Sequence, residues 1–100
     1  MDLHLQNKVI IVTGGAKGIG LGIAKVLAAE GAIPFIVGRS KEDNLKAVEE
    51  IKLKGGKVFQ TVAELTDPAA CEQAVAAVVQ QCGAIDGLVN NAGVLTRPMK

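Results

Sequence analysis

The chain has 100 residues, 49% of them hydrophobic and 2% aromatic, and carries a formal net charge of +1 at pH 7. This composition is typical of a soluble α/β domain, and the interspersed acidic and basic residues leave no basic stripe or aromatic platform for nucleic acid. No apolar stretch is long enough to span a membrane and residues 1–5 do not resemble a signal peptide, so we expect a cytoplasmic protein that binds neither nucleic acid nor membrane.

Strand and helix patterns alternate along the whole chain. Short apolar, β-branched runs predict buried strands, and apolar residues at helical spacing among charged ones predict helices. Glycines end two of the helices, and Asp67-Pro68 begins the third with a capping residue followed by proline. In chain order, the predicted elements are a strand at 8–13, a helix from 21 to about 31, a strand at 34–38, a helix at 41–54, a strand at 57–62, a helix from 68 to about 81 and a strand at 87–90.

This β-α-β-α-β-α-β order predicts the fold class. Short connections between strands and helices imply a parallel sheet with right-handed crossovers and helices on both faces. The architecture that fits is a Rossmann-type, doubly wound α/β sheet with strands in the spatial order 3-2-1-4. In that order the first and fourth strands flank the point where dinucleotides bind, and this chain contains both strands.

The segment between the first strand and the first helix reads Thr-Gly-Gly-Ala-Lys-Gly-Ile-Gly at residues 13–20. Gly14, Gly18 and Gly20 permit a tight loop whose backbone N–H groups face a phosphate at the helix N-terminus. A strand before the loop and a helix after it are the context that a dinucleotide-binding fingerprint requires. A P-loop would instead end in Gly-Lys-Ser or Gly-Lys-Thr. The segment therefore predicts a site for the pyrophosphate of a dinucleotide.

The two cysteines do not indicate a disulfide or a metal site. Cys71 and Cys82 fall in one predicted helix, in which eleven positions correspond to roughly 16 Å along the axis. That separation is too long for a disulfide. With no Cys-x-x-Cys spacing and only His4 as a histidine, we expect small buried thiols and no metal.

A second motif, Asn90-Asn91-Ala92-Gly93, follows the fourth strand. Together with the Thr-Gly-x-x-x-Gly-x-Gly pattern at 13–20, it resembles the N-terminal part of a classical short-chain dehydrogenase/reductase, over essentially the whole chain. The resemblance implies that residues 1–100 are part of an NAD(P)-binding Rossmann domain, from an oxidoreductase that interconverts an alcohol and a carbonyl by hydride transfer. Residues 1–8, 32–34 and 64–67 are also similar to bacterial members that oxidise sugars such as L-fucose, so a sugar is one candidate substrate.

The residues after the second strand bear on the choice between NADP and NAD. An acidic side chain there would hold the ribose hydroxyls and repel a 2′-phosphate, but the chain has Gly38, Arg39 and Ser40. Arg39 can pair with a phosphate through two hydrogen bonds, and Lys17 in the glycine loop is a second cation. NADP-preferring members of the resembled family commonly carry basic residues at these two positions. NADP is therefore favoured and NAD is the alternative, which applies if both cations are only solvated loop charges.

The resemblance also implies roles for residues after the third and fourth strands. Glu64 and Leu65 stand where the family has an aspartate and a small apolar residue against the adenine; a solvated acid is the alternative. Asn90 and the following Ala-Gly pair match a segment along the cofactor ribose, or else form a turn, and Asn91 matches a side chain that ties adjacent strands together. The predicted cofactor-binding residues are Gly14, Lys17, Gly18, Ile19, Gly20, Arg39, Ser40, Glu64, Leu65, Asn90, Ala92 and Gly93.

The catalytic residues that the resemblance implies are not found in this chain. The family uses a tyrosine as general acid or base, a lysine four residues later and a serine. This chain has no tyrosine, and its one serine is Ser40, beside the predicted ribose site. We assign no catalytic residue and expect the 100-residue chain to be inactive by itself.

The sequence is compatible with three interpretations of its function. In the first, it is the cofactor-binding part of a longer, homo-oligomeric oxidoreductase acting on a small alcohol or carbonyl; the fourth strand is then an open edge, and we expect poor solubility of the chain alone. In the second, it is a non-catalytic nucleotide-binding or redox-sensing module. In the third, it is a partial chain with no independent function.

Overall fold

The computed structural model describes residues 4–91. Within them, four parallel strands form one sheet in the spatial order β3-β2-β1-β4. This order confirms the predicted doubly wound α/β fold. The elements are β1 (Val9–Thr13), α1 (Gly18–Ala29), β2 (Ile33–Gly38), α2 (Lys41–Leu53), β3 (Phe59–Val62), α3 (Pro68–Cys82) and β4 (Gly87–Asn90).

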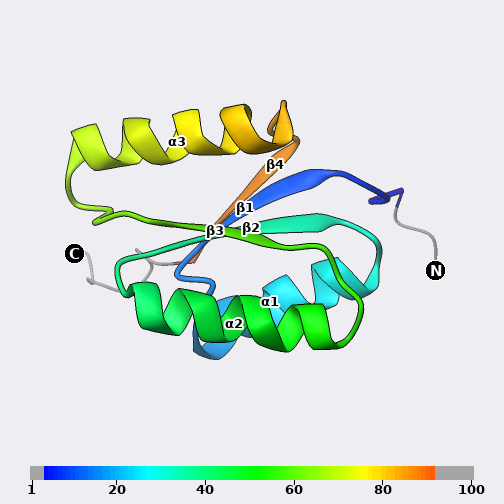
Figure 1. The fold of residues 1–100 in the computed structure, drawn as a ribbon. Coiled ribbons are helices and arrows are strands. Elements are labelled where there is room, and N and C mark those ends of the chain that lie inside the picture. The colour runs from blue at the N-terminus through cyan, green and yellow to red at the C-terminus, as the bar shows by residue number, and fades with distance from the viewer. Residues whose placement is uncertain (1–3, 92–100) are drawn as a thin grey trace, which may run out of the picture.

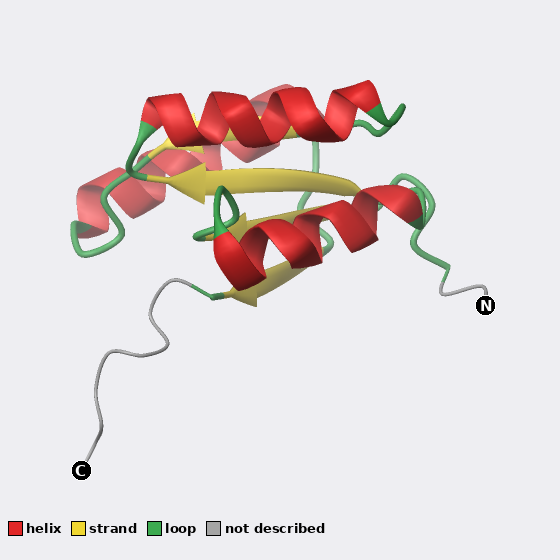
Figure 2. Ribbon diagram, turned by 90° about the horizontal axis from the view of Figure 1, so that it is seen from below, coloured by secondary structure: helices red, strands yellow, loops and turns green. Residues whose placement is uncertain are grey.

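Helices cover both faces of the sheet. Figure 1 shows α1 and α2 on one face and α3 on the other, and Figure 2 shows the same layers seen from below. Each helix connects two parallel strands, so the chain must cross a face of the sheet between them. The carboxyl ends of the four strands consequently lie along one edge of the sheet, and the loops that leave them meet there.

The two central strands, β1 and β2, are buried on both faces. Successive strand residues point to opposite faces, so Ile11, Phe35 and Val37 pack with Ala74 and Val78 of α3. The residues between them pack under α1 and α2. Because neither face meets water, these strands are nearly continuous apolar runs instead of alternating ones, which is why the sequence pattern identifies them.

The element bounds differ from the predicted ones in two informative places. α1 begins at Gly18, inside the glycine motif, and not near residue 21. β3 begins at Phe59 and not at residue 57, because its pairing with β2 starts where Phe59 lies opposite Phe35. The other bounds differ by no more than two residues, and β4 spans residues 87–90 as predicted.

β4 is an edge strand of the described sheet, since it is hydrogen-bonded only to β1 within residues 4–91. Leu88 is 62% exposed, whereas Val89 packs against the cluster that contains Ile10 and Val12. The expected open edge at the fourth strand is therefore present within the described residues, and Leu88 makes it apolar. Such an edge offers unpaired backbone groups and apolar surface to another chain.

Candidate dinucleotide-binding site

The glycine loop leaves the carboxyl end of β1 and turns directly into α1. Gly14 and Gly18 have φ angles of 66° and 55°, a left-handed conformation that glycine adopts without steric cost. The Gly14 N–H donates to the Val37 carbonyl at 2.9 Å, which fixes the start of the loop against β2. The tight turn predicted for these glycines is present.

The N-terminus of α1 carries unsatisfied donors. Lys17 occupies the N-cap position, its side chain makes no capping hydrogen bond, and the first turn of α1 holds no acidic residue. The first N–H groups of a helix have no partner inside the helix, and together with the helix dipole they attract an anion. Gly18, Ile19 and Gly20 supply these groups, and the Ile19 side chain is 76% exposed.

Gly20 permits the close packing of α1 on the loop. A Cβ atom at this position would overlap the Gly14 carbonyl oxygen and would lie 2.9 Å from Asn91 Nδ2. The first contact is with backbone, which cannot rotate away. A side chain at residue 20 would therefore separate the helix N-terminus from the loop.

Thr13 joins the ends of β1 and β4. The Asn91 N–H donates to Thr13 Oγ1 at 2.9 Å, and Thr13 Oγ1 lies 3.1 Å from the acceptor Asn90 Oδ1. Asn91 Nδ2 donates to the Gly14 carbonyl at 3.4 Å, which confirms the expected role of Asn91 in tying strands together. This role of Thr13 was not predicted, although a polar residue at the end of a buried strand was the available signal.

The two cations expected near a ribose phosphate each lie beside a carboxylate. Lys17 Nζ is 3.2 Å from Asp43 Oδ2, and the hydrogen bond from Lys17 lowers the pKa of the Asp43 carboxyl. Arg39 Nη1 is 3.9 Å from Glu64 Oε1, and the Arg39 side chain is 80% exposed. Exposed ion pairs of this kind are weak, so both cations remain open to a competing anion.

Ser40 has a structural role that was not predicted from the sequence. Its hydroxyl is the N-cap of α2 and accepts a hydrogen bond from the Asp43 N–H at 3.2 Å. The Ser-x-x-Asp spacing at the start of a helical pattern was the available signal. Ser40 nevertheless lies next to Arg39, at the end of β2.

Glu64 and Leu65 follow β3 at the same edge of the sheet. Glu64 Oε2 accepts a hydrogen bond from Thr66 Oγ1 at 3.3 Å, and the half-buried Leu65 packs against the cluster under α3. The structure thus brings Glu64 to Arg39, and Lys17 to the start of α2. Ala92 and Gly93 lie outside the described residues.

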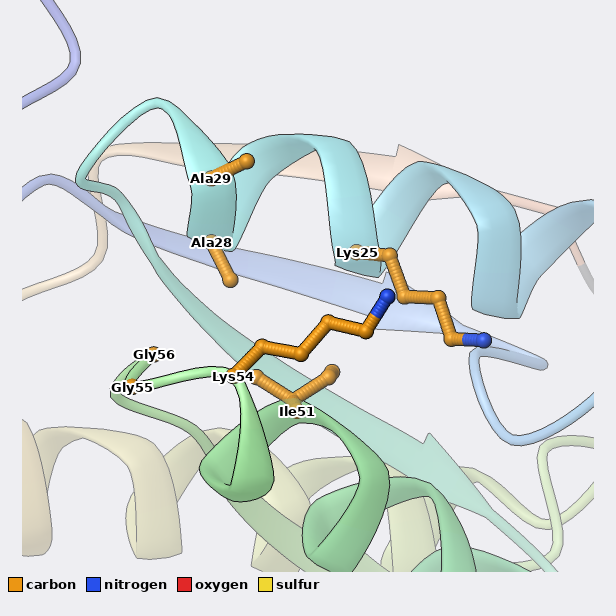
Figure 3. Close-up of a pocket in the computed structure, with 7 residues that line it drawn as sticks. All are labelled: Lys25, Ala28, Ala29, Ile51, Lys54, Gly55 and Gly56. Atoms are coloured by element: carbon orange, nitrogen blue, oxygen red, sulfur yellow. The ribbon is translucent and has the colours of Figure 1, made fainter.

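A separate hollow of about 260 Å³ lies between α1 and α2. Figure 3 shows Lys25, Ala28, Lys54 and Gly55 among the residues that line it, near the C-terminal ends of the two helices. Its lining includes no residue of the glycine loop or of the strand ends. Helix C-termini carry partial negative charge and do not favour a phosphate, so this hollow is not the candidate site.

Other classes of site are not built by the described residues. Residues 4–91 contain no group of three or more His, Cys, Asp or Glu side chains placed to hold a metal ion. Cys71 and Cys82 both lie in α3, half-buried and not in a disulfide, and burial raises the pKa of the Cys82 thiol. No helix in this part of the chain is long and apolar enough to cross a membrane.

The sequence profile described as short chain dehydrogenase matches residues 8–100. The chain belongs to the short-chain dehydrogenase family. Among its relatives is a Streptomyces violaceoruber protein named as putative ketoacyl reductase 1 of the granaticin polyketide synthase, which is 47% identical over 85 residues. The alignment covers 85% of this chain and 31% of the relative, so this short-chain dehydrogenase sequence spans about a third of the length of that protein.

Solved structures of family members superimpose on the fold. L-Sorbose reductase from Gluconobacter frateurii, in a complex with NADPH and L-sorbose, has a TM-score of 0.90 at 34% identity, covering 99% of this chain and 38% of its own. The actinorhodin polyketide ketoreductase with NADPH has a TM-score of 0.82 at 35% identity, covering 85% of this chain and 33% of its own. The expected family is therefore confirmed.

Proposed function

We propose that this chain is the cofactor-binding N-terminal part of an NADP-preferring oxidoreductase that interconverts an alcohol and a carbonyl. The observation that carries the proposal is the glycine loop, which leads from β1 into an α1 N-terminus with no capping side chain. Membership of the short-chain dehydrogenase family supports the oxidoreductase class. The NADPH bound by two structural neighbours supports a nicotinamide dinucleotide.

The residues at the edge of the sheet fit the pyrophosphate. The backbone N–H groups of residues 18–20 supply donors, and the absence of a side chain at Gly20 keeps the helix close to the loop. Gly14 completes the turn. The nicotinamide ring, when bound, donates or accepts the hydride, while these residues bind and orient the rest of the cofactor.

We base the proposed preference for NADP on the residues at the end of β2. Position 38 is glycine, so no carboxylate repels a 2′-phosphate there. Arg39 and Lys17 are exposed cations held only by surface carboxylates. A phosphate that takes up both cations gains charge-assisted hydrogen bonds and replaces weak ion pairs, with Ser40 beside it.

The proposed contacts to the adenine and the ribose, and the proposed substrate, rest on the resemblance to the family. We assign Glu64 and Leu65 to the adenine, and Asn90, Ala92 and Gly93 to the ribose. The chain, residues 1–100, forms part of the dinucleotide-binding domain and contributes no catalytic residue in this account. A sugar is a candidate substrate because three segments resemble sugar-oxidising members and one neighbour binds L-sorbose.

Replacing Arg39 by Asp tests the cofactor assignment. The substitution removes a charge-assisted hydrogen bond and adds a repulsive carboxylate, so we expect the affinity for NADP to fall about ten- to hundredfold while that for NAD is unchanged or rises. Isothermal titration calorimetry with both dinucleotides at fixed salt measures the ratio. Lys57→Asp is the matched control, because it makes the same charge change before the amino end of β3. Equal NADP affinity in the two variants would remove Arg39 from the phosphate site.

A further inference from the structure

Asn44 is a buried polar side chain to which neither the family resemblance nor the proposed function assigns a role. It lies in the first part of α2 and is 0% exposed. Its Nδ2 group lies 3.2 Å from the Gly38 carbonyl oxygen, 3.1 Å from Gln60 Oε1 and 3.1 Å from the Thr61 carbonyl oxygen, so its two N–H groups are shared among three acceptors. One amide therefore joins the end of β2 to β3. These acceptors also fix which way the amide points, since a reversed amide would set oxygen against oxygen.

The other end of this amide faces Gly38. Asn44 Oδ1 is buried and has no hydrogen-bond partner within the described residues. A Cβ atom built on Gly38 would lie 2.6 Å from that oxygen, which is shorter than a van der Waals contact. Asn44 cannot turn away without losing the bonds that Nδ2 makes, so its amide occupies the space that a side chain at position 38 would need.

A carboxylate at position 38 would meet a second obstacle. Aspartate has only hydrogen-bond acceptors when ionised, and Oδ1 is already a buried acceptor without a donor. Placing these groups together adds electrostatic repulsion to the steric overlap. Position 38 is also where an acidic residue would hold the ribose of NAD.

We propose that Asn44 is a specificity-determining positioning residue, whose buried amide keeps position 38 as glycine and so excludes the acidic side chain that would select NAD. The same amide, together with the Ala63 N–H, holds the Gly38 carbonyl. The strand end from which the next residue, Arg39, extends is therefore held in place. A change of preference to NAD then requires two substitutions, at positions 38 and 44. The specificity half of this inference rests on the proposed function.

A double-mutant cycle on the 100-residue chain tests, without any cofactor, whether Asn44 and a side chain at position 38 compete for the same space. In the parent, we expect Gly38→Ala to raise the unfolding equilibrium constant in urea about tenfold or more, because of overpacking. After Asn44→Ser or Asn44→Ala, the same change is expected to be neutral or stabilising, since glycine no longer contributes unfolded-state freedom. Two replacements of Asn44 are used so that the cycle does not depend on one variant folding.

Gly22→Ala is the matched control for the cycle. Apart from the adjacent residues and backbone of its own helix, a Cβ atom built on Gly22 would have no atom within 4 Å, so this substitution is expected to have the same effect with or without Asn44. Additive effects of Gly38→Ala and the Asn44 substitutions would overturn the proposal. Non-additivity at position 38, with additivity at position 22, supports it.

Titration with NADP and NAD tests the specificity half. We expect Gly38→Asp alone to be destabilised and not to prefer NAD, and Gly38→Asp with Asn44→Ser to bind NAD at least about tenfold more tightly relative to NADP than the parent does. A stable, NAD-preferring Gly38→Asp single variant would overturn the proposal. If the cycle is non-additive but the folded parent binds neither dinucleotide, the proposed function fails and the specificity role of Asn44 falls with it.

Discussion

Gly20→Ala is expected to abolish saturable dinucleotide binding and to lower the free energy of unfolding by about 1–3 kcal/mol. The new Cβ atom would overlap the Gly14 carbonyl oxygen. Relief requires α1 to move away from the loop, which disperses the N–H groups that face the phosphate. Urea unfolding followed by circular dichroism measures the loss of stability, and calorimetric titration with NADP measures the loss of binding.

Gly22→Ala, two positions along the same helix, is the control. Apart from the adjacent residues and backbone of its own helix, the added methyl group meets no atom within 4 Å, and replacing a helical glycine by alanine stabilises by about 0.5–1 kcal/mol. The two substitutions should therefore have opposite effects on stability. If Gly20→Ala proves as benign as Gly22→Ala, the close approach of α1 to the loop is wrong.

Thr13→Val is expected to cost about 1–3 kcal/mol of stability, because it removes a buried hydroxyl and leaves polar groups at and just after the end of β4 without that partner. The hydroxyl oxygen accepts from the Asn91 N–H at 2.9 Å and lies 3.1 Å from Asn90 Oδ1. Valine has nearly the same shape, so packing is largely preserved. The loss should appear in urea unfolding.

Thr13→Ser distinguishes the contribution of the hydroxyl to stability from that of the methyl group. Serine keeps the oxygen that joins β1 to β4 and loses only the smaller packing contribution. We expect the serine variant to be the more stable of the two. Equal stability of the serine and valine variants would show that the hydroxyl does not hold the two strands together.

The sheet and its strand order were predictable because the residues of the central strands show locally, by their continuous apolar pattern, that both faces of these strands are buried. β1 and β2 are apolar without alternation, and only a sheet covered on both faces requires that. The glycines at residues 14–20 are equally local, since a turn and an open helix N-terminus need nothing from distant residues. Chain order and handedness then fix where the loops meet.

The tasks of Ser40 and Asn44 were harder to predict, because both depend on their surroundings. The position of Ser40 after β2 predicts a residue beside the cofactor, but its hydroxyl caps α2. Asn44 is polar within a charged helix, yet it shares the buried stripe of Ala47 and Ile51. Its spacing from those residues was the one local signal, and its acceptors on β2 and β3 are set by tertiary packing.

The ion pairs at the site could not be read from the sequence. Lys17 meets Asp43, and Arg39 meets Glu64, only after α2 and β3 are placed beside the glycine loop. Each cation has several carboxylates in the sequence that would serve equally well on charge alone. Surface pairs also contribute little to stability, so folding does not depend on choosing them.

Mapping NADP onto the backbone by two-dimensional ¹⁵N–¹H NMR tests the central claim most directly. During titration of the labelled chain, we expect the amide signals of residues 14–20 and of Arg39 to shift with one common saturation curve. The signals of Lys54, Gly55 and Gly56, at the hollow between α1 and α2, should stay in place. Shifts confined to that hollow, or no shifts in a chain whose spectrum is that of a folded protein, would contradict the account.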